Sequence, residues 1–216
     1  MSVSLVIFDL DGTLLNTIAD LGTATNHALN VCGYSTHPIS KYPDFVGNGV
    51  NNLIKRALPE SARSESEIMR LKPHFIKYYD KHNIDNTRPY DGILSLLDAL
   101  SKRNINMAIA SNKYQSAVEK LSQHYFSHIN WVATEGQKDI YPIKPDPSIV
   151  FDILSKCPTP LNNVLYVGDS GVDMQTAQRA GIKSVGVTWG FRPQSELEQN
   201  SATYIINNPI DILTLL

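Results

Sequence analysis

The chain has 216 residues, of which 42% are hydrophobic, and a formal net charge of −2 at pH 7. This length can bury one hydrophobic core and leaves room for a smaller inserted lobe. The 19 Lys and Arg nearly balance the 21 Asp and Glu without a basic run, which argues against nucleic acid or a membrane surface as a partner. The first apolar run meets Asp9 too soon for a signal peptide, so we expect a cytoplasmic protein.

A short apolar segment near the start of the chain ends in two carboxylates. Residues 3–8 predict a buried strand, and Asp9 and Asp11 follow it directly. Packing gives no reason for paired carboxylates there, so a cation should neutralise them. Two oxygen donors at this spacing suit Mg2+, which keeps water and phosphate oxygens as its other ligands. The alternative is an acidic turn held by hydrogen bonds between side chain and backbone.

The remaining elements follow in chain order from the spacing of apolar residues. We predict helices over 17–32, 49–58 and 64–82, followed from Asp91 by alternating helices and short strands. The later helices are expected at 91–103, 114–125, 147–156 and 172–180, and the strands at 106–110, 129–133, 163–168, 183–187 and 204–206. This alternation predicts an α/β fold with a Rossmann-like, doubly wound parallel sheet.

The helical block interrupts the alternation directly after the first strand. We therefore expect two domains: an α/β catalytic core formed by residues 1–14 and 86–216, and an inserted α-helical cap formed by residues 15–85. In sheets of this kind the chemistry lies at the carboxyl ends of the strands.

Polar residues follow one of the later predicted strands. Strand 106–110 runs into Ser111 and Asn112, which we expect to open a helix whose free N–H groups favour an anion. A plain capping serine is the ordinary alternative for Ser111.

Two further positions carry charged residues of the same kind. Strand 163–168 runs into Asp169 and Asp173, and Lys144 lies in a segment stiffened by prolines at 142, 145 and 147. Taken singly, acids are tolerated at a helix start and lysines are usually on the surface. Their joint occurrence around one sheet favours a site for phosphate and metal.

The motifs match a known family in content and order. Asp9-Leu-Asp11-Gly12-Thr13, Ser111, Lys144 and Gly168-Asp169-x-x-x-Asp173 resemble the four motifs of haloacid dehalogenase-superfamily phosphatases with a helical cap, over residues 3 to about 190. The resemblance implies that Asp9 is the nucleophile and that Asp11 is the general acid and base. It also implies that Lys144 is catalytic and that Ser111 and Asn112 contact the phosphoryl group.

The same resemblance implies a metal cofactor. Mg2+ would be bound by the Asp9 carboxylate, the backbone carbonyl of Asp11 and Asp169, with Asp173 in support.

A glycine-containing loop in the predicted cap bears on the substrate. Gly47-Asn48-Gly49 leads into a helix, whose free N–H groups can bind an anion, and the segment is similar to the cap loop of phosphoglycolate phosphatases. We therefore expect this loop to contact the acid end of the substrate, with Lys55 or Arg56 as helpers. Asn16 departs from the pattern, because many relatives carry an acid there.

The sequence thus predicts a Mg2+-dependent phosphatase that hydrolyses a small phosphomonoester, best guess phosphoglycolate, through an aspartyl-phosphate. Phosphatases for a sugar phosphate or a nucleotide monophosphate, and a pyrophosphatase, stay open. A β-phosphoglucomutase-like mutase is a weaker alternative. A silent relative that binds a phosphorylated ligand or a protein partner is the non-enzymatic one. The expected partner is a small phosphorylated metabolite, and the expected state is a monomer or homodimer. We also expect Trp189 near the rim of the site.

Overall fold

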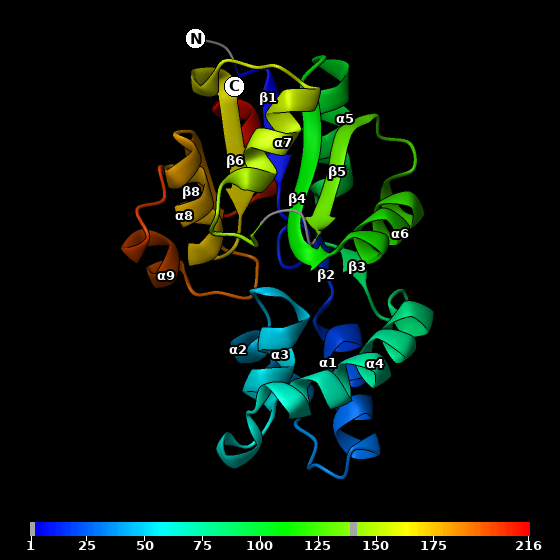
Figure 1. The fold of residues 1–216 in the computed structure, drawn as a ribbon. Coiled ribbons are helices and arrows are strands. Elements are labelled where there is room, and N and C mark those ends of the chain that lie inside the picture. Colours follow the sequence, from blue (N-terminus) through cyan, green and yellow to red (C-terminus); the bar gives the residue numbers. More distant parts are fainter. Residues whose placement is uncertain (1–2, 139–141) are drawn as a thin grey trace. The chain divides into compact units, whose positions relative to one another are not determined.

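The computed structural model describes residues 3–138 and 142–216. The chain divides into two compact units, which are shown as ribbons in Figure 1. The sheet unit comprises Met1–Asn16 and Pro89–Leu216, and the helical unit comprises Thr17–Arg88. No helix within the described ranges combines the length and hydropathy needed to span a membrane.

The sheet unit is built on six parallel strands in the order β5-β4-β1-β6-β7-β8. The strands are β1 (Leu5–Phe8), β4 (Asn106–Tyr114), β5 (Trp131–Gln137), β6 (Val164–Gly168), β7 (Lys183–Val187) and β8 (Tyr204–Ile206). Leu5 pairs with Asn106 on one side and Val164 on the other, so β1 is central and completely buried. The predicted doubly wound parallel sheet is confirmed.

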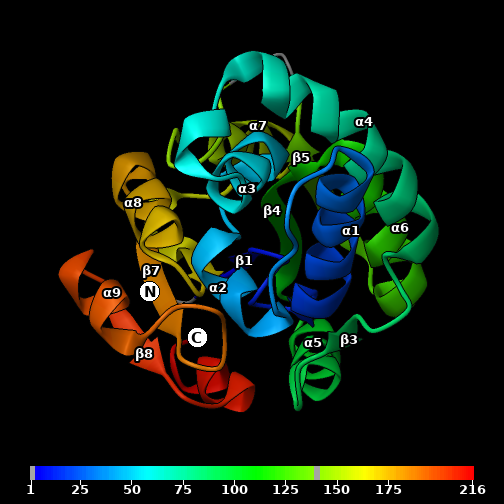
Figure 2. The same cartoon turned by 90° about the horizontal axis from the view of Figure 1, so that it is seen from below.

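Helices cover both faces of this sheet. They are α5 (Ile93–Lys102), α6 (Gln115–Phe126), α7 (Ser148–Lys156), α8 (Gly171–Ala180) and α9 (Gln194–Gln199), with 3-10 turns at Leu161–Asn163 and Pro209–Thr214. Ile149 of α7 and Ala177 of α8 join Leu5 and Ile7 in one apolar cluster. The alternate residues of β1 face the other side, where α5 lies (Figure 2).

The structure corrects one local prediction in this unit. Ser111 and Asn112 do not open a helix, because β4 continues to Tyr114 and α6 begins only at Gln115. The ladder between β4 and β5 is irregular after Ala110 and resumes where Tyr114 pairs with Gln137. Ser111 and Asn112 therefore do not stand at a helix start, and whether they contact a phosphoryl group stays a prediction.

The helical unit contains α1 (Ile18–Val31), α2 (Tyr42–Phe45), α3 (Gly49–Ala57) and α4 (Glu65–His82), with 3-10 turns at Ile39–Lys41 and Glu60–Ala62. The predicted helices over 17–32, 49–58 and 64–82 agree with α1, α3 and α4 to within a residue at each end. The α4 helix begins where the Ser64 hydroxyl accepts a hydrogen bond from the Glu67 N–H, at 3.3 Å.

A buried carboxylate stabilises the helical unit where the chain returns from it. Asp20, on the first turn of α1 and 3% exposed, accepts hydrogen bonds from the backbone N–H groups of Asn86 (3.0 Å) and Thr87 (2.8 Å). The hydroxyl of Thr87 donates a further bond of 2.8 Å. The short strands β2 (Leu15–Asn16) and β3 (Arg88–Pro89) pair with each other beside this point.

Candidate active site

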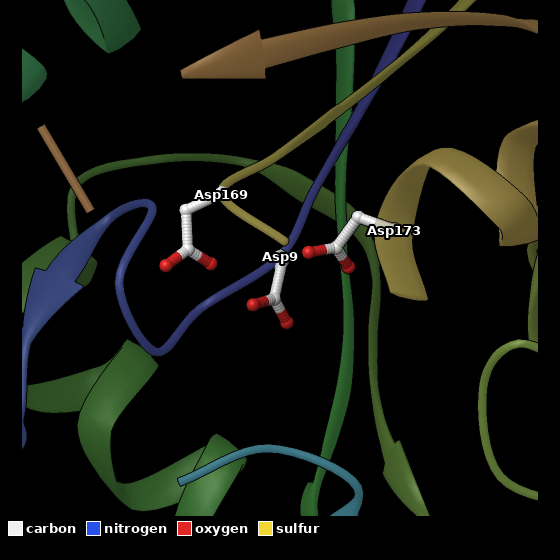
Figure 3. Close-up of side chains that lie close together, drawn as sticks. All are labelled: Asp9, Asp169 and Asp173. Carbon is white, nitrogen blue, oxygen red and sulfur yellow. The ribbon is translucent and has the colours of Figure 1, made fainter. Parts of the chain in front are cut away.

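Three buried aspartates form a cluster at the carboxyl edge of the sheet. Carboxylate oxygens of Asp9, Asp169 and Asp173 all lie within 4.8 Å of one another. Figure 3 shows the Asp9 carboxylate between the other two. Asp9 directly follows β1 and Asp169 directly follows β6, and these neighbouring strands pair through Phe8 and Val167. Asp173 lies in the first turn of α8.

Lys144 supplies the positive charge that faces this cluster. Its Nζ lies 2.9 Å from Oδ1 of Asp9 and 2.7 Å from Oδ1 of Asp173. The lysine side chain is only 3% exposed. The predicted surface alternative for Lys144 is therefore wrong, since a buried ammonium requires such anionic partners.

Three residues outside the recognised motifs hold Lys144 in place. Its Nζ also lies 2.9 Å from the Ala110 carbonyl oxygen and 3.0 Å from the hydroxyl of Tyr166. At the backbone, the Lys144 N–H donates to Oδ1 of Asn112 (2.8 Å) and its carbonyl accepts from Nδ2 of Asn112 (3.1 Å). The Asn112 amide, which the sequence suggested for phosphate, is thus engaged in orienting the lysine.

Burial controls the protonation of the cluster. Desolvation raises the pKa of Asp9 from 3.8 to about 7, although the neighbouring Lys144 acts to lower it. The pKa of Asp169 is raised well above its ordinary value by burial and then by the negative charges of Asp173 and Asp9. Burial acts to lower the pKa of Lys144, but Asp173 and Asp9 raise it well above the usual range. The lysine therefore stays charged.

Backbone groups and glycines fix Asp169 in position. Its Oδ2 accepts a 2.7 Å hydrogen bond from the N–H of Phe191. Gly12 has φ +89°, and a Cβ added there would lie 2.7 Å from the Cγ of Asp169. Gly190 also approaches closely, because a Cβ at that position would lie 2.5 Å from both Oδ2 of Asp169 and the Gly12 carbonyl oxygen. A side chain at either glycine would displace the carboxylate.

Asp173 has a structural role in addition to its contact with Lys144. Its Oδ2 accepts hydrogen bonds from the Ser170 N–H (3.1 Å) and hydroxyl (2.6 Å) at the start of α8. The helix-capping alternative considered for this acid is therefore also true, and one carboxylate both caps the helix and binds the lysine.

The second aspartate of the Asp-x-Asp motif has a lysine of its own. Lys113 Nζ lies 2.9 Å from both Oδ1 and Oδ2 of Asp11. The sequence offered no signal for Lys113, which looked like an ordinary lysine beside a predicted helix start. Ser111 is 2% exposed, and its hydroxyl accepts a 3.3 Å hydrogen bond from the Lys113 N–H.

Two aromatic residues of the sheet unit also lie near these groups. Trp189 Nε1 donates a 3.0 Å hydrogen bond to the carbonyl of Thr13, in agreement with its expected place near the site. The pKa of Tyr90 is raised by burial and then by the charges of Asp169 and Asp11. Sequence analysis did not single out Tyr90.

The loop Gly47-Asn48-Gly49 belongs to the helical unit and is held from within it. Asn48 has φ +60° and stands at the start of α3. The Arg56 guanidinium donates to the carbonyls of Phe45 (3.0 Å) and Gly47 (3.1 Å) and to Oδ1 of Asn48 (3.0 Å). Arg56 therefore stabilises the loop. Whether Gly47, Asn48 and Gly49 bind substrate stays a prediction.

Comparison with known proteins identifies the family. Residues 6–187 match the haloacid dehalogenase-like hydrolases, and the chain belongs to this family. It is 36% identical over 203 residues to a phosphoglycolate phosphatase of Agrobacterium fabrum, covering 90% of this chain and 85% of the relative. It is 31% identical to a phosphoglycolate phosphatase of Vibrio cholerae, covering 100% and 96% of the two chains.

A solved structure agrees in fold. The crystal structure of a predicted phosphoglycolate phosphatase from Haemophilus somnus superimposes with a TM-score of 0.91 at 27% identity, covering 100% of this chain and 98% of that one. The expected resemblance to the haloacid dehalogenase superfamily is thus confirmed, and the relatives support the expected class of phosphoric monoester hydrolases.

Proposed function

We propose that the protein is a Mg2+-dependent phosphatase that hydrolyses a small phosphomonoester through an aspartyl-phosphate on Asp9. The observation that carries this proposal is the Lys144 ammonium held between Asp9 and Asp173 at the carboxyl edge of the sheet. A fixed positive charge beside a carboxylate lowers the repulsion that an incoming phosphate dianion would otherwise meet. An ion pair with a purely structural role would not require a further buried carboxylate, that of Asp169, beside it.

The residues divide the reaction into two steps. An oxygen of Asp9 forms a bond to phosphorus while the bond to the leaving alcohol breaks, and Asp11 gives its proton to the leaving oxygen. Water then attacks phosphorus, returns a proton to Asp11 and displaces Asp9, which frees inorganic phosphate. The Ser111 hydroxyl is proposed to donate a hydrogen bond to a phosphoryl oxygen.

The donor set of the acidic cluster fits Mg2+. Three buried carboxylates lie within 4.8 Å of one another, and Lys144 contacts two of them, Asp9 and Asp173. Burial, and then the negative charges of neighbouring carboxylates, raise the pKa values of Asp9 and Asp169, and a bound cation would oppose this rise. Asp9, Asp169 and Asp173, with the backbone carbonyl of Asp11, would hold the ion. When bound, it supplies charge stabilisation for the phosphoryl oxygens.

Phosphoglycolate is the proposed substrate. The support is that relatives sharing 31–36% of their residues carry the name phosphoglycolate phosphatase. We propose that residues 1–14 and 86–216 act as the catalytic core and that the helical segment 15–85 acts as a substrate-selecting cap. In this cap Gly47, Asn48 and Gly49 would meet the carboxylate end of the substrate. We propose that the small metabolite is hydrolysed in the cytoplasm.

The decisive experiment is phosphate release from a panel of esters with Mg2+ and then with EDTA. The panel contains phosphoglycolate, several sugar phosphates, nucleotide monophosphates and pyrophosphate. We expect a kcat/KM for phosphoglycolate that exceeds the others by at least about tenfold, and loss of all activity in EDTA. Equal rates across the panel would contradict phosphoglycolate as the preferred substrate but not the phosphatase reaction. Undiminished activity in EDTA would contradict the requirement for Mg2+. No release from any ester would reject the phosphatase itself.

A further inference from the structure

The Asp11 carboxylate is engaged through both of its oxygens by one buried lysine. Lys113 Nζ lies 2.9 Å from each oxygen, and the side chains of Lys113 and Asp11 are 3% and 15% exposed. Removing two charges from water costs several kcal/mol, which a single pair does not reliably recover. A pair this buried in the middle of a candidate active site therefore calls for a functional reason.

The position of the pair follows from the sheet. The ladder between β1 and β4 ends where Phe8 pairs with Ile109. Beyond that point the two segments are no longer paired with each other. Asp11 lies three residues after Phe8, and Lys113 lies four residues after Ile109. The ion pair thus spans the carboxyl edge of two adjacent strands, one of which carries Asp9. Each aspartate of the Asp-x-Asp motif consequently has its own lysine, Lys144 for Asp9 and Lys113 for Asp11.

We propose that Lys113 is the positioning residue of Asp11: its ammonium holds both oxygens of this carboxylate and orients it toward the leaving group. This inference rests on the proposed function, in which Asp11 moves the proton. In the first step the phosphorus–oxygen bond to the alcohol breaks as the bond to Asp9 forms, and the alcohol oxygen takes the proton. In the second step water gives a proton back to Asp11.

The inference predicts a dependence on the leaving group that a structural role would not produce. An alkyl alcohol needs a proton to leave, whereas p-nitrophenolate leaves without one. Lys113→Met should therefore lower kcat for the best alkyl phosphate of the panel by about 10² or more. With p-nitrophenyl phosphate the first step should slow by less than about tenfold. A stoichiometric burst of p-nitrophenolate should appear, because the second step still needs Asp11 as the base.

A double-mutant cycle tests the same inference independently. If Lys113 acts through Asp11, then Lys113→Met should add less than about threefold to the loss already caused by Asp11→Asn on the alkyl ester. Lys113→Arg should restore most of the lost activity, because it keeps the positive charge. Lys156→Met, which removes a lysine paired with Glu135 and Asp152, is the matched control and should leave both substrates unaffected.

The outcomes separate this inference from the proposed function. Equal slowing of the first step on alkyl and aryl esters, or independent effects of the two mutations, would overturn the role of Lys113 while the wild type remains a phosphatase. A wild type without activity on any ester would overturn the proposed function itself. Thermal unfolding of each variant checks folding, and Lys113→Gln, which keeps a hydrogen-bond donor, replaces Lys113→Met if the latter is unfolded.

Discussion

The ammonium of Lys144 lies 2.9 Å from Oδ1 of Asp9, although the two residues are 135 positions apart in the chain. Asp173 accepts from the same ammonium at 2.7 Å. Removal of the lysine would leave two buried carboxylates without their cation.

Lys144→Met should lower the free energy of unfolding at pH 8 by about 3–5 kcal/mol, the usual cost of breaking a buried pair from one side. The loss should be smaller at pH 5, where Asp9 takes up a proton. Urea unfolding at the two pH values measures both quantities. Lys156 is 41% exposed and its partner Glu135 keeps a second lysine, Lys138, so Lys156→Met should change stability by less than about 1 kcal/mol. Similar losses for the two lysines would contradict the special position of Lys144.

Asp9→Asn should reduce turnover by at least about 10³-fold, because the amide is a poor nucleophile toward phosphorus. The near-isosteric side chain should leave the fold intact, which circular dichroism checks. Trapping of radiolabelled phosphate on the acid-quenched protein gives a second readout. We expect label on the wild type and none on Asp9→Asn. Retained labelling would move the nucleophile to another residue.

The stability of the metal-free protein should fall as pH rises. The folded-state pKa of Asp9 is about 7, against 3.8 for an ordinary exposed aspartate such as that of the unfolded chain, so the folded state binds this proton more tightly than the unfolded state. The resulting stability is fully present below about pH 4 and is lost as pH rises through about 7. Thermal unfolding in EDTA across this pH range measures the effect, and the same series on Asp9→Asn measures the contribution of the other titrating groups.

Mg2+ should offset this loss. An ion present at about 100 times its dissociation constant adds about 2.7 kcal/mol, which corresponds to about 5–10 °C in Tm for a chain of this size. We expect such a shift at pH 8 and a much smaller one at pH 5, where protons compete for Asp9 and Asp169. Equal shifts at the two pH values would argue against metal binding by these carboxylates.

Gly12→Ala should abolish most activity, because the new Cβ would lie 2.7 Å from the Cγ of Asp169. Gly33→Ala is a matched control, since Gly33 also has positive φ, +80°, but a Cβ there meets nothing within 4 Å. Both variants share the backbone strain of about 1–2 kcal/mol. Only Gly12→Ala should lose phosphatase activity, by at least about 10²-fold. Comparable activity in the two variants would show that the Asp169 position tolerates displacement.

Asp20→Ala should destabilise the helical unit by about 2–4 kcal/mol, because the buried N–H group of Thr87 and its hydroxyl would lose their acceptor. Hydrogen exchange at Asn86 and Thr87 should accelerate accordingly. Asp80→Ala, at an exposed position of α4, serves as the control. Unchanged exchange in Asp20→Ala would mean that other contacts hold this segment.

The acidic cluster could be predicted from the sequence because its position depends on the order of the strands in the parallel sheet. In a parallel sheet, residues that directly follow adjacent strands must meet, and Asp9 and Asp169 are such residues. Lys113 could not be predicted, because its position depends on the irregularity of β4 after Ala110, which leaves no periodic signal. The helix start was wrongly predicted at Ser111 and Asn112 for the same reason.

Short helices could not be predicted from the sequence for a different reason. The helix α9 has six residues and a single buried side chain, Leu197, so it offers no apolar repeat. The sequence also did not show that Asn112 binds the backbone of Lys144, because an amide suited to phosphate is equally suited to these backbone groups. Residue types indicated the chemistry of the site, but they did not indicate which side chains are hydrogen-bonded to each other.

The central place of β1 in the sheet has a consequence for how the site is assembled. Its two neighbours, β4 and β6, begin about 100 and 160 residues later in the chain. Contacts between such distant residues close only after a large loss of chain entropy, and they form slowly. During synthesis from the N-terminus Asp9 emerges first, but Asp169 and Asp173 become available to it only after Gly168 and the residues that follow have left the ribosome. Recovery of activity on refolding should therefore trail the formation of helical structure.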